Sequence, residues 1–268
     1  MHKLQTIGTI DNLQKVNYSV IKRIDREVCE RSDKINMVKS KKLIGIAAPA
    51  TMYEEENPRK DVYNFGNNYG KRIYDCGGIP LGILPSDGWV EDTVLDQFDG
   101  FLICGGHKFW PYHLQIVDYA VRTGKPLLGI CLGMQSIYWY FRVKDYIEET
   151  EFKGSLWEAF QSLRAKVGKM DSVEGHQMEH IRGLEEDTKH EVELVPGSLI
   201  QRLVGTDTLR AGSFHRFKIG EPSSKNAVTG KAPDGTIEVI EYGEQILGVQ
   251  FHPEIDQTLL SIFSILFQ

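Results

Sequence analysis

Short apolar runs without polar alternation recur along the first half of the chain, and each is followed by a stretch of helical character. The runs cover residues 43–48, 79–84, 100–104 and 126–130. Strands that are apolar on both faces are typical of parallel sheets, because helices cover such sheets on each side. Helices are expected between these runs, from about residue 61 to 77, over 90–98, and over 111–124. The alternation predicts an α/β fold with a mainly parallel central sheet flanked by helices.

The second half of the chain has a different pattern. From residue 142 a polar stretch of helical character leads to a strand at 191–194, and further strands are expected near 208–214 and 226–232. Residues 236–242 alternate between apolar and polar side chains, which predicts a half-exposed strand. Residues 246–251 form another apolar run, and a terminal amphipathic helix is expected to close the chain.

The amino-terminal segment 1–42 is predicted to be a helical extension of a single domain spanning 43–268. Val16, Val20, Ile24 and Val28 recur at helical spacing among charged residues. This spacing predicts one amphipathic helix, whose apolar stripe must cover either the main domain or a partner subunit. A homo-oligomer is therefore left open.

Composition excludes several classes of protein. A net charge of -6 with no basic stripe argues against a nucleic-acid partner. The amino terminus has no apolar stretch of signal-peptide length, and the longest apolar segment, 259–267, is too short to span a bilayer. We therefore expect a cytoplasmic protein without a membrane partner. The cysteines (Cys29, Cys76, Cys104 and Cys131) include no Cys-x-x-Cys pair, which argues against a disulfide framework and a structural zinc site.

Cys131 is the best candidate for a nucleophile. It directly follows the apolar run 126–130 and is flanked by Gly129 and Gly133. A tight turn from strand to helix strains its central residue and points that side chain out of the sheet, and it needs small neighbours. A following helix would favour the thiolate and would place the Leu132 N–H beside a developing oxyanion. Cys29, Cys76 and Cys104 lack this setting and are interpreted as small buried hydrophobes.

His252 and Glu254 complete the candidate catalytic group. His252 follows the apolar run 246–251, which places it at the edge of the sheet where active sites of α/β proteins collect. Glu254 lies two residues on, so in extended backbone the two side chains share a side. A carboxylate there can orient the imidazole while the imidazole deprotonates the thiol.

The segments from Gly129 to Gln135 and from Gly248 to Glu254 resemble the signature of class I glutamine amidotransferases, a flavodoxin-like fold. Segments 190–198 and 232–238 are similar to the peptidase C26 branch, the γ-glutamyl-γ-aminobutyrate hydrolase-like proteins. The resemblance runs from about residue 43 to the end and is weakest over 142–189. It implies hydrolysis of a small-molecule γ-glutamyl amide through a thioester on Cys131, with no metal and no cofactor.

The same resemblance implies further site residues. Gly105 or Gly106 would supply the second N–H of the oxyanion hole, and Gln135 would line the glutamyl pocket. Ser213 and His215 match a loop of the family. This chain departs from the family elsewhere in the loop, because Gly212 and Phe217 replace the polar residues usual there. We interpret this loop as contacting the leaving amine, with Arg216 available to pair with a carboxylate on it.

Three alternatives stay open. His176 and His180 with Glu179 fit a short zinc-protease pattern, but such patterns recur by chance and a surface helix accounts for the segment as well. The chain could be a glutaminase subunit that supplies ammonia to a separate synthetase. It could also be a non-catalytic binding or thiol-sensing protein on the same fold.

Overall fold

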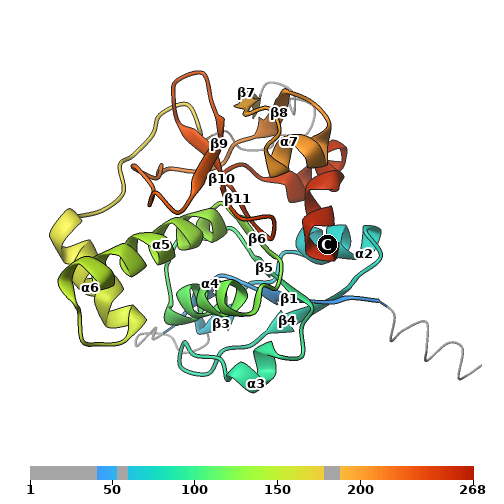
Figure 1. Ribbon diagram of the computed structural model, residues 1–268. Helices are drawn as coiled ribbons and strands as arrows, with labels where there is room; N and C mark the ends of the chain where they lie inside the picture. Colours follow the sequence, from blue (N-terminus) through green and yellow to red (C-terminus); the bar gives the residue numbers. More distant parts are fainter. Residues whose placement is uncertain (1–40, 53–59, 178–187) are drawn as a thin grey trace, which may run out of the picture. The chain divides into compact units, whose positions relative to one another are not determined.

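A nine-stranded sheet forms the centre of the domain in the computed structural model (Figure 1), which describes residues 41–52, 60–177 and 188–268. The predicted extension 1–42 lies almost wholly outside the described residues. In order across the sheet, the strands are β4 (Ile79–Ile83), β1 (Leu43–Ala47), β5 (Gly100–Ile103), β6 (Leu127–Ile130), β11 (Ile246–Val249), β10 (Ile237–Tyr242), β9 (Ala227–Lys231), β7 (Lys189–Leu194) and β8 (Thr208–Gly212).

The first five strands of this order pair in parallel, and the remaining pairs are antiparallel. The predicted mainly parallel α/β fold is confirmed. A separate two-stranded pair joins β2 (Ala50–Thr51) to β3 (Val62–Tyr63). The described part of the chain has no helix that is long and apolar enough to cross a membrane.

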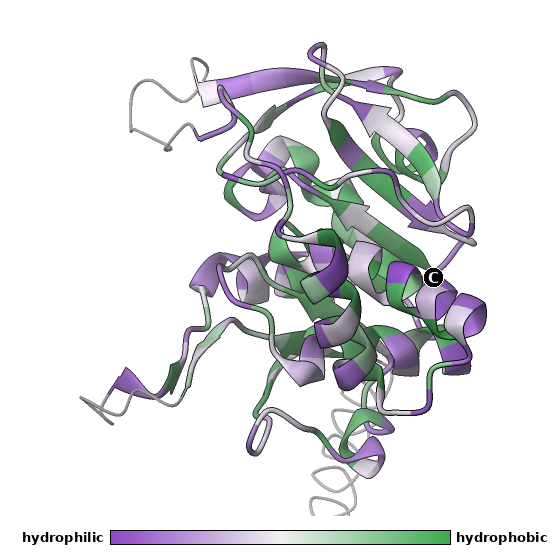
Figure 2. Cartoon of the chain, turned by 90° about the vertical axis from the view of Figure 1, so that its left-hand side faces the viewer, coloured by the Kyte–Doolittle hydropathy of each residue, from purple (hydrophilic) through white to green (hydrophobic). Residues whose placement is uncertain are grey.

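Helices cover both faces of the sheet and create two apolar cores. Successive strand residues alternate between the cores: Phe101 and Ile103 enter one, and Leu102 enters the other. This alternation follows from the period-two geometry of a strand. The first core is closed by α3 (Asp92–Leu95), α4 (Pro111–Thr123), α5 (Leu132–Thr150) and α6 (Leu156–Val167). The second is closed by α2 (Asn67–Asp75), α7 (Leu199–Val204) and the 3₁₀ helix η4 (Gln257–Phe267). Figure 2 shows the apolar residues concentrated on the strands and on the faces between the layers.

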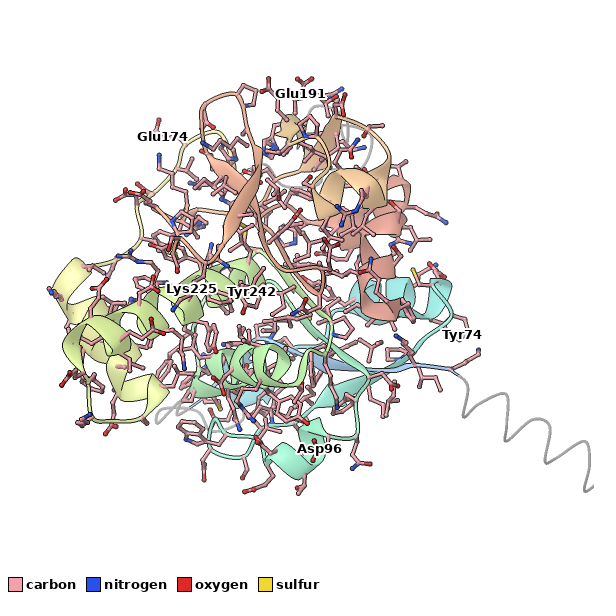
Figure 3. The ribbon with its side chains drawn as sticks, viewed as in Figure 1. Tyr74, Asp96, Glu174, Glu191, Lys225 and Tyr242 are labelled. Carbon is pink, nitrogen blue, oxygen red and sulfur yellow. The ribbon has the colours of Figure 1, made fainter. Side chains whose placement is uncertain are left out.

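An ion-pair network fastens the loop before β9 to helix α5. Lys225, which Figure 3 shows close to α5, lies with its Nζ 2.9 Å from Glu148 Oε1 and 3.3 Å from Asp145 Oδ1. The two ion pairs of Lys225 join this loop to α5 at partly exposed positions.

The structure corrects several boundaries. The helix expected from residue 61 begins only at Asn67, and the helix expected over 90–98 is confined to Asp92–Leu95. The polar stretch after residue 142 contains the end of α5 and all of α6, and residues 178–187 lie outside the description. The terminal amphipathic helix is largely 3₁₀, with a non-helical residue at Leu259. The strand at 236–242 is mostly buried, so the prediction of a half-exposed strand was wrong.

Candidate active site

Cys131 occupies a strained turn between β6 and α5. Its φ of 53° and ψ of -102° lie outside the regions that L-residues prefer, as the glycine-flanked turn predicts. A Cβ on Gly129 would lie 2.5 Å from the carbonyl carbon of Gly133, and a Cβ on Gly133 would lie 2.3 Å from Ile103 O. Any side chain at either flanking position would therefore force backbone segments apart.

The register of β11 against β6 sets where the base lies relative to the nucleophile. Val249 pairs with Ile130, and the Cys131 N–H donates to Val249 O at 2.8 Å. Three residues beyond Val249, the His252 N–H donates to Gly212 O at 3.1 Å. Cys131 and His252 are thus both placed by main-chain hydrogen bonds just past the carboxyl ends of adjacent parallel strands.

Glu254 contacts the imidazole directly. Its Oε1 lies 2.7 Å from His252 Nδ1, and the carboxylate is buried. The chain does not stay extended here, because Pro253 begins the 3₁₀ turn η3 (Pro253–Ile255), yet the two side chains still meet. The Arg72 Nε–H of helix α2 donates to the Glu254 carbonyl at 3.1 Å and fixes this turn.

Charges around His252 favour its protonated form. Burial alone lowers the pKa of His252, but the Glu254 carboxylate and the Cys131 sulfur outweigh burial and raise this pKa well above its ordinary value. An imidazolium beside a sulfur nucleophile is the state that can hold the thiol proton and later deliver it to a leaving group.

Gly105 lies at the point where the three side chains of the site converge. A Cβ there would lie 2.8 Å from His252 Cε1, 3.1 Å from Tyr69 Oη and 3.5 Å from Cys131 Cβ. The Gly105 N–H donates to Tyr69 Oη at 3.1 Å. The predicted oxyanion donor is therefore directed into the site, and in this structure a tyrosine hydroxyl accepts its hydrogen bond.

Gly106 and Leu132 lie against each other beside Gly105. A Cβ on Gly106 would be 2.9 Å from Leu132 Cδ2 and 2.6 Å from Pro49 Cβ. Leu132 is the first residue of α5, where main-chain N–H groups have no partner within the helix. The three backbone donors predicted for the oxyanion hole thus come from two adjoining segments.

The predicted substrate residues divide into two groups. Arg216 is exposed, as are the neighbouring Phe214 and Phe217, whereas Ser213 and His215 are buried and turn toward His176 and Glu238. The ring of Phe214 lies 6.3 Å from that of His252. This loop therefore borders the candidate base His252 through its aromatic residue.

Gln135 is buried on the first turns of α5. Its Nε2 donates to Gln250 Oε1 at 3.2 Å and lies 3.5 Å from Phe217 O. These contacts link α5 to the residue that follows β11 and to the loop between β8 and β9.

The two other described cysteines have different surroundings. Cys104 is fully buried, and burial raises the pKa of its thiol well above the ordinary value. Cys76 is half-buried, and burial raises the pKa of its thiol as well. Neither environment favours a thiolate. Cys104 is buried as predicted, whereas Cys76 is only partly buried.

Sequence reasoning missed the contribution of α2 to the site. Tyr69 reaches the Gly105 N–H and Arg72 holds the Glu254 backbone, one helical turn apart on the same face. The sequence feature that could have indicated this contribution is the three-residue spacing of Tyr69 and Arg72, which places both on one helix face. It is weak, because nothing local indicates that this face meets the catalytic turn.

Comparison with known proteins identifies a family for the region that carries these residues. The family model of peptidase C26 matches residues 111–254, which make up more than half of the chain and include the nucleophile turn, the candidate base and its carboxylate. The chain belongs to the peptidase C26 family. The match begins at α4 and ends within η3, so it covers the part of the C26 domain that carries Cys131, His252 and Glu254.

Individual relatives of this C26 protein are distant. Protein NtpR of Enterococcus hirae is 25% identical over 221 residues, covering 71% of this chain and 84% of NtpR. CTP synthase of Methanothrix thermoacetophila is 26% identical over 247 residues, covering 85% of this chain but only 43% of the synthase.

Solved structures share the fold of this C26 protein. The glutaminase domain of Trypanosoma brucei CTP synthase, with bound acivicin, has a TM-score of 0.54 at 14% identity and covers 84% of this chain and 93% of that domain. A glutamine amidotransferase from Thermotoga maritima has a TM-score of 0.52 at 15% identity, covering 79% and 76%. At these identities the likeness shows the fold alone.

Proposed function

We propose that this peptidase C26 protein is a cysteine hydrolase of γ-glutamyl amides. The observation that carries the proposal is the convergence of Cys131, His252 and the Gly105 N–H at one point past the ends of β6, β11 and β5. A nucleophile, an oriented base and an inward-facing main-chain donor are the three parts that acyl transfer needs. Membership of the family supports the same carbon–nitrogen bond chemistry.

The proposed reaction has two steps. His252, held by Glu254, takes the Cys131 proton, and the sulfur attacks the γ-carbonyl carbon of the substrate. The N–H groups of Leu132 and of Gly105 or Gly106 hold the oxyanion, and the imidazolium donates its proton to the departing amine. Water then adds to the thioester with His252 as base, which releases glutamate and restores the thiol.

The exposed residues of the loop 213–217 support the proposal that this loop determines which leaving amine the site accepts. Phe214 and Phe217 offer apolar surface, and Arg216 offers a positive charge. We propose that the leaving amine combines apolar surface with a carboxylate, as γ-aminobutyrate does. Gln135 would line the glutamyl side of the pocket, and the buried Ser213 and His215 would shape the loop from below.

The decisive experiment measures amine release from γ-glutamyl-γ-aminobutyrate, γ-glutamyl amino acids, γ-glutamyl polyamines and glutamine. Cys131→Ala should abolish release while circular dichroism stays unchanged, and Cys76→Ala is the matched control that should keep full activity. Full activity in Cys131→Ala would refute the proposal. Arg216→Ala should weaken only substrates whose amine carries a carboxylate.

A glutaminase subunit is the second candidate function. The match to CTP synthase covers 85% of this chain and only 43% of the synthase, as expected if this domain corresponds to one part of a larger assembly. The Gly105 N–H is also engaged by Tyr69 here, which would keep an isolated subunit slow. Glutamine hydrolysis that stays slow until a synthetase partner is added would favour this role over a stand-alone hydrolase.

A further inference from the structure

Three histidines converge on one buried carboxylate beside the candidate active site. Glu238 Oε1 lies 3.1 Å from His176 Nδ1, 3.2 Å from His190 Nε2 and 3.3 Å from His215 Nε2. Glu238 is fully buried, and His176 and His215 are each at most 5% exposed. Neither of the two proposed reaction steps uses any of these four residues, and His215 enters the proposed function only by shaping the loop 213–217.

The outer nitrogen of each imidazole has an oxygen partner that fixes its tautomer. His176 Nε2 lies 3.2 Å from Asp234 Oδ2, His190 Nδ1 lies 3.3 Å from Ala211 O, and His215 Nδ1 lies 3.0 Å from Phe217 O. The carbonyl and carboxylate oxygens can only accept, so each imidazole must donate its outer N–H. In a neutral ring the inner nitrogen is then a bare lone pair.

The inner atoms therefore face one another as acceptors. Within the described residues, the inner nitrogens of His176, His190 and His215 and both oxygens of Glu238 are buried without a hydrogen-bond partner. Buried polar atoms are rarely left in this state, because each unmade bond costs about 1–3 kcal/mol. A metal ion placed between these four side chains would satisfy the three imidazole nitrogens and the carboxylate together.

The spacing fits a transition metal. In a tetrahedral zinc site with ligand bonds of about 2.0–2.1 Å, neighbouring ligand atoms lie about 3.3 Å apart. The three nitrogen-to-oxygen distances, 3.1, 3.2 and 3.3 Å, match that edge length. The ligand atoms of His176, His215 and Glu238 all lie within 4.8 Å of one another. His190 lies outside this group of three and would join as a fourth ligand through its position 3.2 Å from Glu238 Oε1. Outer hydrogen bonds from ligating histidines to carboxylate or carbonyl oxygens are the usual support of such sites.

We propose that His176, His190, His215 and Glu238 bind one divalent transition-metal ion, with zinc the ion best suited to this ligand set. Imidazole and carboxylate suit zinc, and four protein ligands describe a structural site rather than a catalytic one. Asp234 supports the site by orienting His176.

The site would stabilise the loop that borders the catalytic histidine. Ser213 Oγ donates to His176 O at 3.0 Å, and the His215 N–H donates to the same carbonyl at 2.8 Å. Phe214, between these two anchors, lies against His252. A metal that holds His176 and His215 together therefore also fixes the position of the Phe214 ring.

The test is zinc binding by the untagged full chain carrying Cys131→Ala, so that the candidate nucleophile cannot contribute a ligand. Bound metal is first removed with a chelator, zinc is then added, and the excess is removed by dialysis. We expect one zinc per chain by mass spectrometry of metals and by competition with a chromophoric chelator. Cobalt(II) should give the visible bands of a tetrahedral site without sulfur charge transfer. Asp234→Asn should weaken binding about 10–100-fold through loss of the supporting carboxylate.

Two ligand variants and one control complete the design. Glu238→Gln keeps the shape of the buried side chain, and His190→Asn changes the most exposed ligand. Both variants should lose the stoichiometric zinc. Circular dichroism verifies that both are folded. His107→Gln, at an exposed histidine outside the cluster, should bind zinc like the parent. Absence of zinc from the folded parent, or equal binding by parent and ligand variants, would overturn the proposal and indicate a cluster held by protons. Neither outcome bears on amide hydrolysis, which Cys131→Ala tests separately.

Discussion

The Tyr69 hydroxyl accepts the hydrogen bond of the Gly105 N–H at 3.1 Å, in the position where an oxyanion would accept it. Burial, followed by the negative charge of Glu254, raises the pKa of Tyr69 well above its ordinary value, so the hydroxyl stays neutral. A substrate oxyanion must displace this oxygen before Gly105 can stabilise it.

Tyr69→Phe should therefore raise kcat/KM for amide hydrolysis. Removing a competing neutral hydrogen bond is worth about 0.5–1.5 kcal/mol, or roughly two- to tenfold in rate. The matched control is Tyr74→Phe on the same helix, at a side chain that is 67% exposed, which should leave kinetics unchanged. A lower rate in Tyr69→Phe would instead assign the hydroxyl a supporting role in the transition state.

Glu254→Gln should reduce stability most at mildly acidic pH. The folded-state pKa of His252 is raised above its unfolded value of about 6.5. Its contribution to stability is therefore fully present below about 6.5 and is lost as pH rises through the folded-state pKa. The Glu254→Gln change lowers the folded-state pKa of His252, so the gap in melting temperature between wild type and variant should narrow as pH rises from mildly acidic to alkaline. A gap independent of pH would show that the carboxylate does not act through the charge on His252.

Cys131→Gly should be more stable than Cys131→Ala, by about 1 kcal/mol, although glycine normally costs stability relative to alanine. The reversal follows from the φ of 53° at this position, which only glycine adopts without strain. Chemical denaturation of both inactive variants measures the difference. Equal stability, or the ordinary order, would mean that the turn relaxes when the sulfur is removed.

Gly133→Ala should destabilise the fold by roughly 1–3 kcal/mol, because its Cβ would lie 2.3 Å from Ile103 O and two backbone segments must separate. Gly70→Ala provides the contrast. A Cβ there would meet Pro80 at 3.7 Å, an ordinary contact, and alanine favours the helix α2 by about 0.5–1 kcal/mol. Thermal melting of the two variants should therefore shift in opposite directions.

The parallel half of the sheet could be predicted from the sequence because most of its strands are buried on both faces, and a short uninterrupted apolar run between turns is typical of such a strand. The turn at Cys131 could also be predicted from the sequence, because the close backbone contacts around it require glycine at positions 129 and 133. Each of these features depends on residues that are adjacent in the sequence, so the sequence alone predicts it.

Strand β10 shows why the rest could not be predicted. Its alternation of apolar and polar residues predicted a half-exposed strand, yet Glu241 is buried and accepts hydrogen bonds from the Leu199 and Ile200 N–H groups at the start of α7. Glu238 is buried among three histidines drawn from separate segments. Helical spacing relates His176 only to Glu179 and His180, which lie outside the described residues, and it cannot reveal partners that tertiary folding alone supplies.

Because Val249 pairs with Ile130, the placement of Cys131 relative to His252 depends on the register between β6 and β11 rather than on the length of chain that joins them. The joining segment includes β10, which pairs with β11 on its other side, so insertions confined to the exposed loops of this segment should leave the register unchanged. A circular permutant with new termini between the exposed residues Gly243 and Glu244 would move β11 to the beginning of the chain and β6 well after it. This permutant should still bring Cys131 and His252 together when β6 and β11 pair in the same register.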